Sequence, residues 1–149
     1  MVNQPMIEVD FNTIIKNLPE YDIPFPPMES PDHIFAGGPV EIEQGFVLHS
    51  ADYASEHTLA IAEDVHMTAT AEIIEAIAKG NGPEKYTLCL GYSGWNPLQL
   101  EEEIAASDWL VVPASITILF DTVPENRFDE AAQKLGLSFA NFSGEVGQA

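Results

Sequence analysis

The amino-acid sequence predicts a single domain of the α/β or α+β class, with a mixed sheet flanked by helices. Short apolar runs of strand length alternate along the chain with segments that repeat apolar residues at helical spacing. This alternation is typical of strands and helices that pack on one another in one layered domain. The chain has 149 residues, of which 46% are hydrophobic and 19% are charged. We therefore expect one globular domain that buries a sizeable core.

Three segments have the apolar spacing of amphipathic helices. The first begins after Asp10, which favours the N-cap position, and the second spans residues 71–79, between Thr70 and Gly80. The third ends at Gly136, because glycine favours the position that follows a helix. The apolar stripes of the three helices consist of Phe11, Ile14, Ile15 and Leu18, of Ile73, Ile74 and Ile77, and of Phe128, Ala131, Ala132 and Leu135.

A fourth helix is predicted from the tetrapeptide Asn96-Pro97-Leu98-Gln99. The Asn96 side chain can accept a hydrogen bond from a free backbone N–H at the helix start, and Pro97 suits the first helical position. The Gln99 side chain can reach back to the N–H of Asn96 and close a capping box. We expect this helix to continue to about residue 107.

The remaining apolar runs predict strands, and one proline-rich segment predicts a loop. Residues 19–31 contain five prolines, which exclude a helix or a central strand and favour an extended loop. Strands are expected over residues 33–36, 45–49, 58–62, 86–90 and 109–112, whereas residues 115–120 fit either a strand or a helix.

The charge of the chain excludes two classes of partner. There are 24 Asp and Glu residues against five Lys and Arg residues, which gives a formal net charge of −19. A surface this acidic repels the phosphates of nucleic acids and the head groups of anionic lipids. We therefore expect neither direct nucleic-acid binding nor docking on a membrane.

The composition also favours a cytoplasmic location. The N-terminus lacks the basic region and apolar core of a signal peptide, and no window reaches the ~20 apolar residues of a membrane span. Cys89 is the single cysteine, so no disulfide can form within the chain. It lies in an apolar run without Lys, Arg or His beside it, which predicts a buried, unreactive thiol.

The four histidines, His33, His49, His57 and His66, predict no metal site. No two of them are three or four residues apart, and no H-E-x-x-H motif occurs. His49 is the most interesting of them, because it ends the apolar run 45–48, where its ring could point into a cleft.

Two glycine turns are candidate binding sites. Residues 91–95 follow a predicted strand and precede a predicted helix, which is the setting of a nucleophile elbow, but position 95 is Trp where the G-x-S-x-G pattern requires glycine. Ser93 is thus a poor match for a nucleophile, and no catalytic residue and no cofactor are predicted. Backbone N–H groups at such turns can hold an anion. The candidate ligand-binding residues are Gly37, Gly38, His49, Gly91, Tyr92, Ser93, Gly94 and Trp95.

Several short motifs follow one another in a characteristic order along the chain. They are Ala36-Gly37-Gly38-Pro39-Val40, Gly45-Phe46-Val47-Leu48-His49, Leu90-Gly91-Tyr92-Ser93-Gly94-Trp95, Gln99-Leu100-Glu101, Asp108-Trp109-Leu110, Ile118-Leu119-Phe120 and Arg127-Phe128. In this order they resemble the AlgH/YqgE family of bacterial proteins, and the resemblance covers nearly the whole chain. It implies one compact domain over residues 1–149, with a bent, partly barrel-like mixed sheet. It implies no established reaction, and members are often described as transcriptional regulators.

The chain departs from the family pattern at both ends. Members usually carry a further N-terminal segment with two strands, so the resemblance implies a domain that is short at its N-terminus. An unpaired strand edge would then favour self-association. The usual Gly-His-Ala ending is Gly147-Gln148-Ala149 here, so no role of that terminal histidine transfers to Gln148.

These observations favour a non-catalytic regulatory or binding protein that acts through a protein or a small-molecule partner. The alternative is an enzyme acting on a small metabolite, with His49 as acid or base and the backbone N–H groups of the glycine turns as an anion site. An enzyme requires polar side chains that converge in one cleft, whereas a binding protein requires exposed apolar surface. A purely structural role also explains these residues, with the glycines making tight turns and Tyr92 and Trp95 packing in the core.

Overall fold

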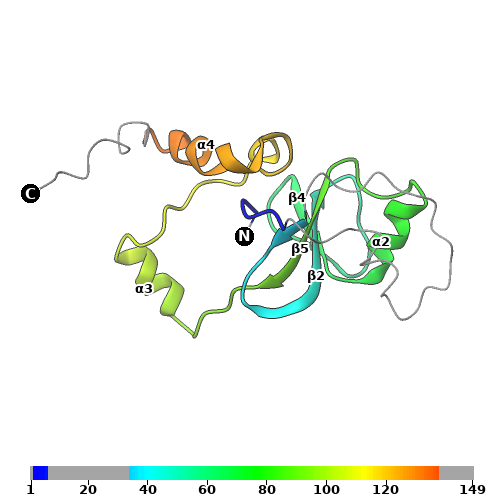
Figure 1. The fold of residues 1–149 in the computed structure, drawn as a ribbon, viewed down its shortest axis with the longest axis horizontal. Helices are drawn as coiled ribbons and strands as arrows, with labels where there is room; N and C mark the ends of the chain where they lie inside the picture. The colour runs from blue at the N-terminus through cyan, green and yellow to red at the C-terminus, as the bar shows by residue number, and fades with distance from the viewer. Residues whose placement is uncertain (1, 7–33, 138–149) are drawn as a thin grey trace, which may run out of the picture.

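The centre of the molecule is a five-stranded sheet with the strand order β1-β5-β2-β4-β3 (Figure 1). The structure is a computed structural model that describes residues 2–6 and 34–137. The strands are β1 (Ile34–Ala36), β2 (Val40–Ser50), β3 (Thr58–Ala60), β4 (Val65–Thr68) and β5 (Tyr86–Tyr92).

The sheet is mixed and open. β1 runs parallel to β5, whereas the pairs β2–β5, β2–β4 and β3–β4 are antiparallel. The predicted α/β class with a mixed sheet is therefore confirmed. Among the described strands, β1 and β3 form the two edges and do not pair with each other, so the sheet does not close into a barrel.

One face of the sheet packs against α2 (Ala71–Ala78). Strand residues Ile34, Val47 and Leu88 form the core with three helical residues at the predicted spacing, Ile73, Ile74 and Ile77. The helix was predicted over residues 71–79, and Lys79 is its C-cap. Thr70 occupies the N-cap position as expected, but its side chain makes no capping hydrogen bond.

Two more helices lie on the other side of the sheet from α2, as Figure 1 shows. They are α3 (Gln99–Ala105) and α4 (Arg127–Lys134). The Asn96 N–H donates to Oε1 of Gln99 at 3.1 Å, so one half of the predicted capping box forms. The helix nevertheless begins later than predicted, because Leu98 adopts a left-handed conformation with φ of 69° and serves as the N-cap. α4 ends before Gly136, as predicted, and this glycine has φ of +74°.

The strand predicted over residues 109–112 is wrong. The segment forms no strand, and Leu110 and Val111 are 47% and 63% exposed. Its apolar residues satisfy the strand pattern, but the indole N–H of Trp109 donates to Glu103 of α3 and holds the segment beside that helix. Residues 115–120, which fitted either element, contribute to the π-helical turn η1 (Thr117–Asp121), which is followed by the 3₁₀ turn η2 (Pro124–Asn126).

The other strand predictions are confirmed, with shifts at their ends. β2 begins five residues before the predicted 45–49 segment, and β3 ends two residues before the predicted end at 62. β4 was not predicted, because polar His66 and Thr68 interrupt its apolar residues. The helix expected after Asp10, the loop 19–31 and His33 lie outside the described residues. Within the described residues, no helix is long and apolar enough to cross a bilayer.

Candidate binding site

The two glycine turns of the sequence lie in direct contact. The parallel pairing of β1 with β5 sets Ala36 opposite Leu90, so the turn after β1 meets the C-terminal end of β5, where Gly91 and Tyr92 lie. The N–H of Gly37 donates to the carbonyl of Leu90 at 2.7 Å. A Cβ atom added to Gly38 would stand 2.2 Å from the carbonyl carbon of Tyr92. Glycine is required here because the two backbones touch.

Gly91 has a second reason to be glycine. Its φ is +72°, in the left-handed region that side chains disfavour, and an added Cβ would stand 2.5 Å from the carbonyl oxygen of Gly38. The N–H of Gly37 is already bonded to Leu90, so it does not present the free anion-binding donor that the sequence suggested. These turns therefore act by close backbone packing and fix the position of the residues that follow β5.

An apolar cavity of about 660 Å³ opens beside these turns, on the sheet face opposite α2. Residues Phe46 and Leu48 alternate along β2 with Val47 and His49, which point to the α2 side. None of the described residues that line it carries a formal charge. They are Val2, Gly37, Phe46, Leu48, Met67, Cys89, Gly91, Tyr92, Ser93, Trp95 and Trp109.

One carboxylate holds the two tryptophans of this cavity together. The ring centroids of Trp95 and Trp109 are 5.7 Å apart, with an angle of 74° between the ring planes. Both indole N–H groups donate to Oε2 of Glu103, at 3.0 Å from Trp95 and 2.7 Å from Trp109. Gln99 donates to the other carboxylate oxygen at 2.8 Å. The hydrogen bonds from Trp109, Gln99 and Trp95 lower the pKa of Glu103.

The wall of the cavity continues through the end of β5. Tyr92 stacks edge-on against Phe46, with ring centroids 5.8 Å apart, and its side chain is partly exposed. Ser93 lines the cavity next to it, but no histidine of the described residues does so. The geometry thus supplies no histidine base for Ser93, whereas it supplies a broad aromatic surface.

His49 does not belong to this cavity. It is 0% exposed, and its Nδ1 and Nε2 lie 2.8 Å from the carbonyl oxygen of Ser50 and 3.0 Å from the hydroxyl of Thr68. The Thr68 hydroxyl lies in turn 2.8 Å from that of Thr58. Burial lowers the pKa of His49, so the ring is neutral near pH 7. His49 therefore joins β2, β4 and β3 in a buried polar network.

The sequence singled out half of this site. Five of the eight candidate residues line the cavity, namely Gly37, Gly91, Tyr92, Ser93 and Trp95. Gly38 supports it by backbone contact, Gly94 does not line it, and His49 lies on the opposite face. The residues missed were Val2, Phe46, Leu48, Met67, Cys89 and Trp109. In β2, apolar side chains occupy both faces of the sheet, with Val47 on one face and Phe46 and Leu48 on the other. This pattern was the sequence signal for Phe46 and Leu48.

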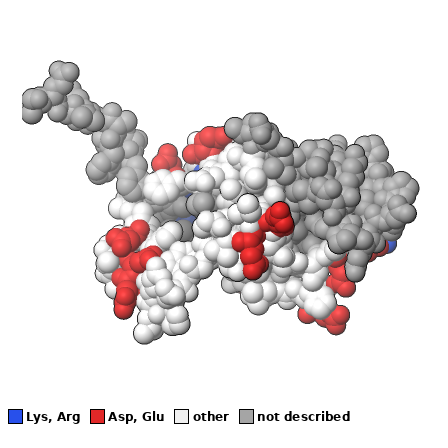
Figure 2. Space-filling view, turned by 60° about the horizontal axis from the view of Figure 1, so that its bottom comes forward, with Lys and Arg blue, Asp and Glu red and all other residues white. Residues whose placement is uncertain are grey.

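The surface outside the cavity carries the acidic charge. Figure 2 shows Asp and Glu in several separate groups on one face, with broad uncharged areas between them. Three exposed side chains, Glu56, His57 and Glu72, bring their ligand atoms within 4.8 Å of one another. The sequence spacing did not reveal this group, and exposed acidic groups of this kind are common without a bound ion.

Comparison with known proteins identifies the family. The sequence profile of the family described as AlgH-like matches residues 1–140. The chain belongs to the AlgH-like family. It is 35% identical to the AlgH protein of Pseudomonas aeruginosa, whose solution structure superposes with a TM-score of 0.76 over 99% of this chain and 77% of that one. The resemblance described from the motifs is thereby confirmed.

AlgH-like relatives carry names that state no activity. A UPF0301 protein of Allorhizobium ampelinum is 48% identical over 124 residues, which are 80% of this chain and 62% of that protein. A UPF0301 protein of Agrobacterium fabrum is 39% identical over 153 aligned positions, which cover all of this chain and 76% of that protein. The chain thus spans about three fifths to three quarters of the length of these two AlgH-like relatives.

Proposed function

We propose that this AlgH-like chain is a non-catalytic binding protein whose apolar cavity receives an uncharged, largely apolar ligand and so serves a regulatory role. The observation that carries the proposal is the uncharged cavity of about 660 Å³ between the Trp95–Trp109 pair and the sheet face opposite α2. Small-molecule sites commonly have volumes of about 300–1,000 Å³ and mostly apolar walls. A cytoplasmic location agrees with the single cysteine.

The chemistry of the surroundings favours an uncharged ligand. The cavity offers aromatic faces, its lining residues Tyr92 and Ser93 each carry a hydroxyl group, and none of the described residues that line it is ionised. The described lining gives an anion no cationic side chain to pair with, and it gives a cation no carboxylate. The buried, fully bonded state of His49 gives the enzyme alternative no support.

The proposal can be tested with an uncharged probe and one reporter residue inside the cavity. Nile red, which is neutral and fluoresces in apolar surroundings, should bind saturably to the full chain. Cys89 lines the cavity and is the only cysteine of the chain, so its alkylation by iodoacetamide, followed by mass spectrometry, reports on this site alone. Burial raises the pKa of the Cys89 thiol, so alkylation should be slow, and bound Nile red should slow it further.

A filled cavity provides the decisive variant. Leu48→Trp places a larger side chain in the cavity, and Ile61→Trp makes the same kind of change at a residue that is 52% exposed and outside the lining. Leu48→Trp should abolish both Nile red binding and the protection of Cys89, whereas Ile61→Trp should leave both unchanged. Equal Nile red binding by the two variants, or binding without protection of Cys89, would overturn the proposal.

A further inference from the structure

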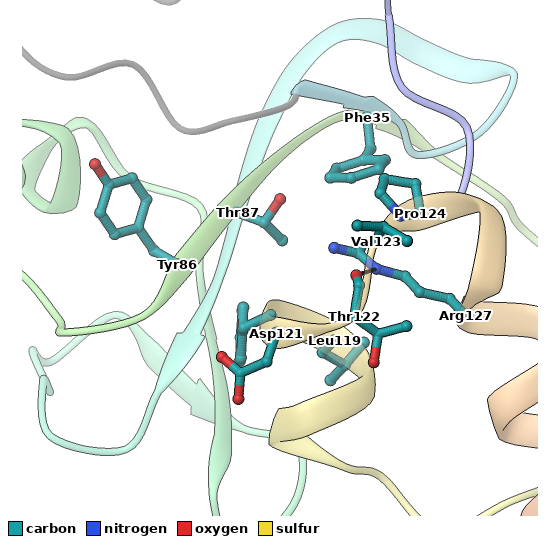
Figure 3. Close-up of a pocket in the computed structure, with 10 residues that line it drawn as sticks. Phe35, Tyr86, Thr87, Leu119, Asp121, Thr122, Val123, Pro124 and Arg127 are labelled. Carbon is teal, nitrogen blue, oxygen red and sulfur yellow. Dashed lines mark hydrogen bonds between the residues drawn. The ribbon is translucent and has the colours of Figure 1, made fainter.

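A separate cavity of about 320 Å³ lies between the sheet and the segment that contains η1, η2 and the start of α4 (Figure 3). Phe35 of β1 and Thr87 of β5 line it from the sheet, and Val123 and Arg127 line it from the opposite side. Arg127 is only 7% exposed. Its guanidinium group points into the space between these elements in Figure 3.

The guanidinium group of Arg127 is fixed but only partly bonded. Its Nε donates to the carbonyl oxygen of Thr122 at 3.0 Å, and its Nη1 donates to that of Val2. The guanidinium group packs against the face of the Phe35 ring, with 4.7 Å between the central guanidinium carbon and the ring centroid. Arginine has five N–H donors, and the other three meet no acceptor among the described residues.

The charge of Arg127 has no counterion in the described part of the chain. No Asp or Glu oxygen there lies within 4.0 Å of it, and the exposed Glu125, whose charge acts on it from a distance, forms no ion pair with it. Asp121 pairs with Lys85 at 2.6 Å, and Glu130 accepts a hydrogen bond from the Thr122 hydroxyl at 2.7 Å. A buried cation without a partner is costly, and buried charges in proteins are normally paired. An anion in this cavity would supply the missing partner.

The other walls of the cavity select the kind of anion. Phe35, Leu119, Val123 and Pro124 supply apolar contacts, and the Thr87 side chain adds a hydroxyl on the sheet side. Asp121 also lines the cavity, and the ammonium group of Lys85 neutralises its carboxylate. The apolar part of the lining favours a ligand with an apolar body, which a small inorganic anion lacks. A planar carboxylate matches the geometry of a guanidinium group better than other common anions of this size.

We propose that this cavity binds a small monocarboxylate with a compact apolar body. The carboxylate accepts hydrogen bonds from the free N–H groups of Arg127, and the body packs against Phe35 and Val123. The site differs from the apolar cavity in its walls and in the charge of its ligand, so the proposal is independent of the proposed function.

The test uses benzoate as the probe, with benzamide as its neutral analogue of the same shape. In an NMR titration of the full chain, benzoate should shift the Nε–Hε signal of Arg127 saturably. Benzamide and inorganic phosphate should each bind at least about tenfold more weakly, as expected when a charge-assisted hydrogen bond or the apolar contacts are missing. Equal binding of benzamide or of phosphate would overturn the proposal.

Variants locate the binding. Arg127→Gln should weaken benzoate binding at least about tenfold, since it removes the charged donor, whereas Lys134→Gln removes the same charge from an exposed position of the same helix and should change nothing. Thr87→Val keeps the side-chain shape but removes the hydroxyl, and it should weaken benzoate binding several-fold. This variant tests whether benzoate binds in the cavity even if Arg127→Gln does not fold. Leu48→Trp should leave benzoate binding intact. Unchanged binding in Thr87→Val, equal losses in Arg127→Gln and Lys134→Gln, or loss in Leu48→Trp would refute the site.

Discussion

Glu103 of α3 accepts a hydrogen bond from the indole of Trp109 across 2.7 Å, and this bond fixes an exposed segment beside a helix that has no buried residue of its own. The same carboxylate oxygen accepts from Trp95, which follows β5. One side chain thus connects the end of the sheet, α3 and the segment after it. The carboxylate of Glu103 thus holds the two tryptophans that form the aromatic wall of the apolar cavity.

The tryptophan pair should therefore respond to acid. The pKa of Glu103 is lowered by its three hydrogen bonds, so their stabilisation is present above the ordinary glutamate value of about 4.3 and is lost as the pH falls through the lowered value. Near-ultraviolet circular dichroism reports on both tryptophans of the chain and should change only below pH ~4.3. Glu103→Gln should lack this transition. A change that is complete above pH ~5, or one that persists in Glu103→Gln, would contradict the assignment.

The contact between the glycine turns predicts unequal costs for two similar substitutions. In Gly38→Ala the new methyl group would stand 2.2 Å from the Tyr92 backbone, so the strands must separate. We expect a loss of about 3 kcal/mol or more in the free energy of unfolding. In Gly94→Ala the nearest atom is 4.0 Å away, and the free energy should change by less than about 0.5 kcal/mol. Urea melts of both variants measure the difference, and similar midpoints would show that the turns do not pack as described.

Replacement of His49 should destabilise the fold. His49→Asn breaks the buried network with Ser50 and Thr68 and should cost on the order of 1–3 kcal/mol. His57→Asn is the matched control, because the His57 side chain is 49% exposed and its loss should not move the urea midpoint. An unchanged midpoint for His49→Asn would contradict the structural role and reopen the search for a substrate.

His49 should also give the stability a pH dependence. Its pKa is lowered by burial, so the unfolded chain binds a proton more readily than the folded one, and stability should fall as the pH drops below about 6.5. Urea midpoints measured from pH 7.5 to 5 should decline in the wild type and decline less in His49→Asn. The same slope in both proteins would mean that other groups cause the decline.

The net charge predicts the response to salt. With a formal charge of −19, self-repulsion should destabilise the folded state at low ionic strength. The melting temperature should rise as NaCl increases from a few millimolar to ~0.2 M, where the screening length is under ~10 Å. A flat or falling melting temperature would contradict this. In the same buffers, a fluorescence-anisotropy titration should detect no binding to duplex DNA at physiological salt.

Local patterns in the sequence were sufficient for the elements whose residues repeat with a clear period. The spacing of Ile73, Ile74 and Ile77 located α2, and the position of Gly136 located the end of α4. The pattern at 109–112 failed because apolar residues can pack beside a helix as well as in a sheet, and only the bond between Trp109 and Glu103 distinguishes the two.

The binding site required information that no local pattern contains. The two glycine turns were recognised separately, but their contact follows from the parallel pairing of β1 with β5, which are distant in the sequence. The burial of His49 depends on its cross-strand neighbour His66 in β4, a strand that the sequence did not reveal. The environment of Arg127 likewise depends on Val2 and Phe35, from the other end of the chain.

The central place of β5 has a consequence for synthesis of the protein. β5 lies between β1 and β2, so β1 cannot join the sheet until residues 86–92 have left the ribosome, although β2 can already pair with β4. At typical rates of translation, β1 waits about 3–10 s for its partner. During that interval β1 lacks its sheet partner, and unpaired strand edges of this kind expose a nascent chain to misassembly.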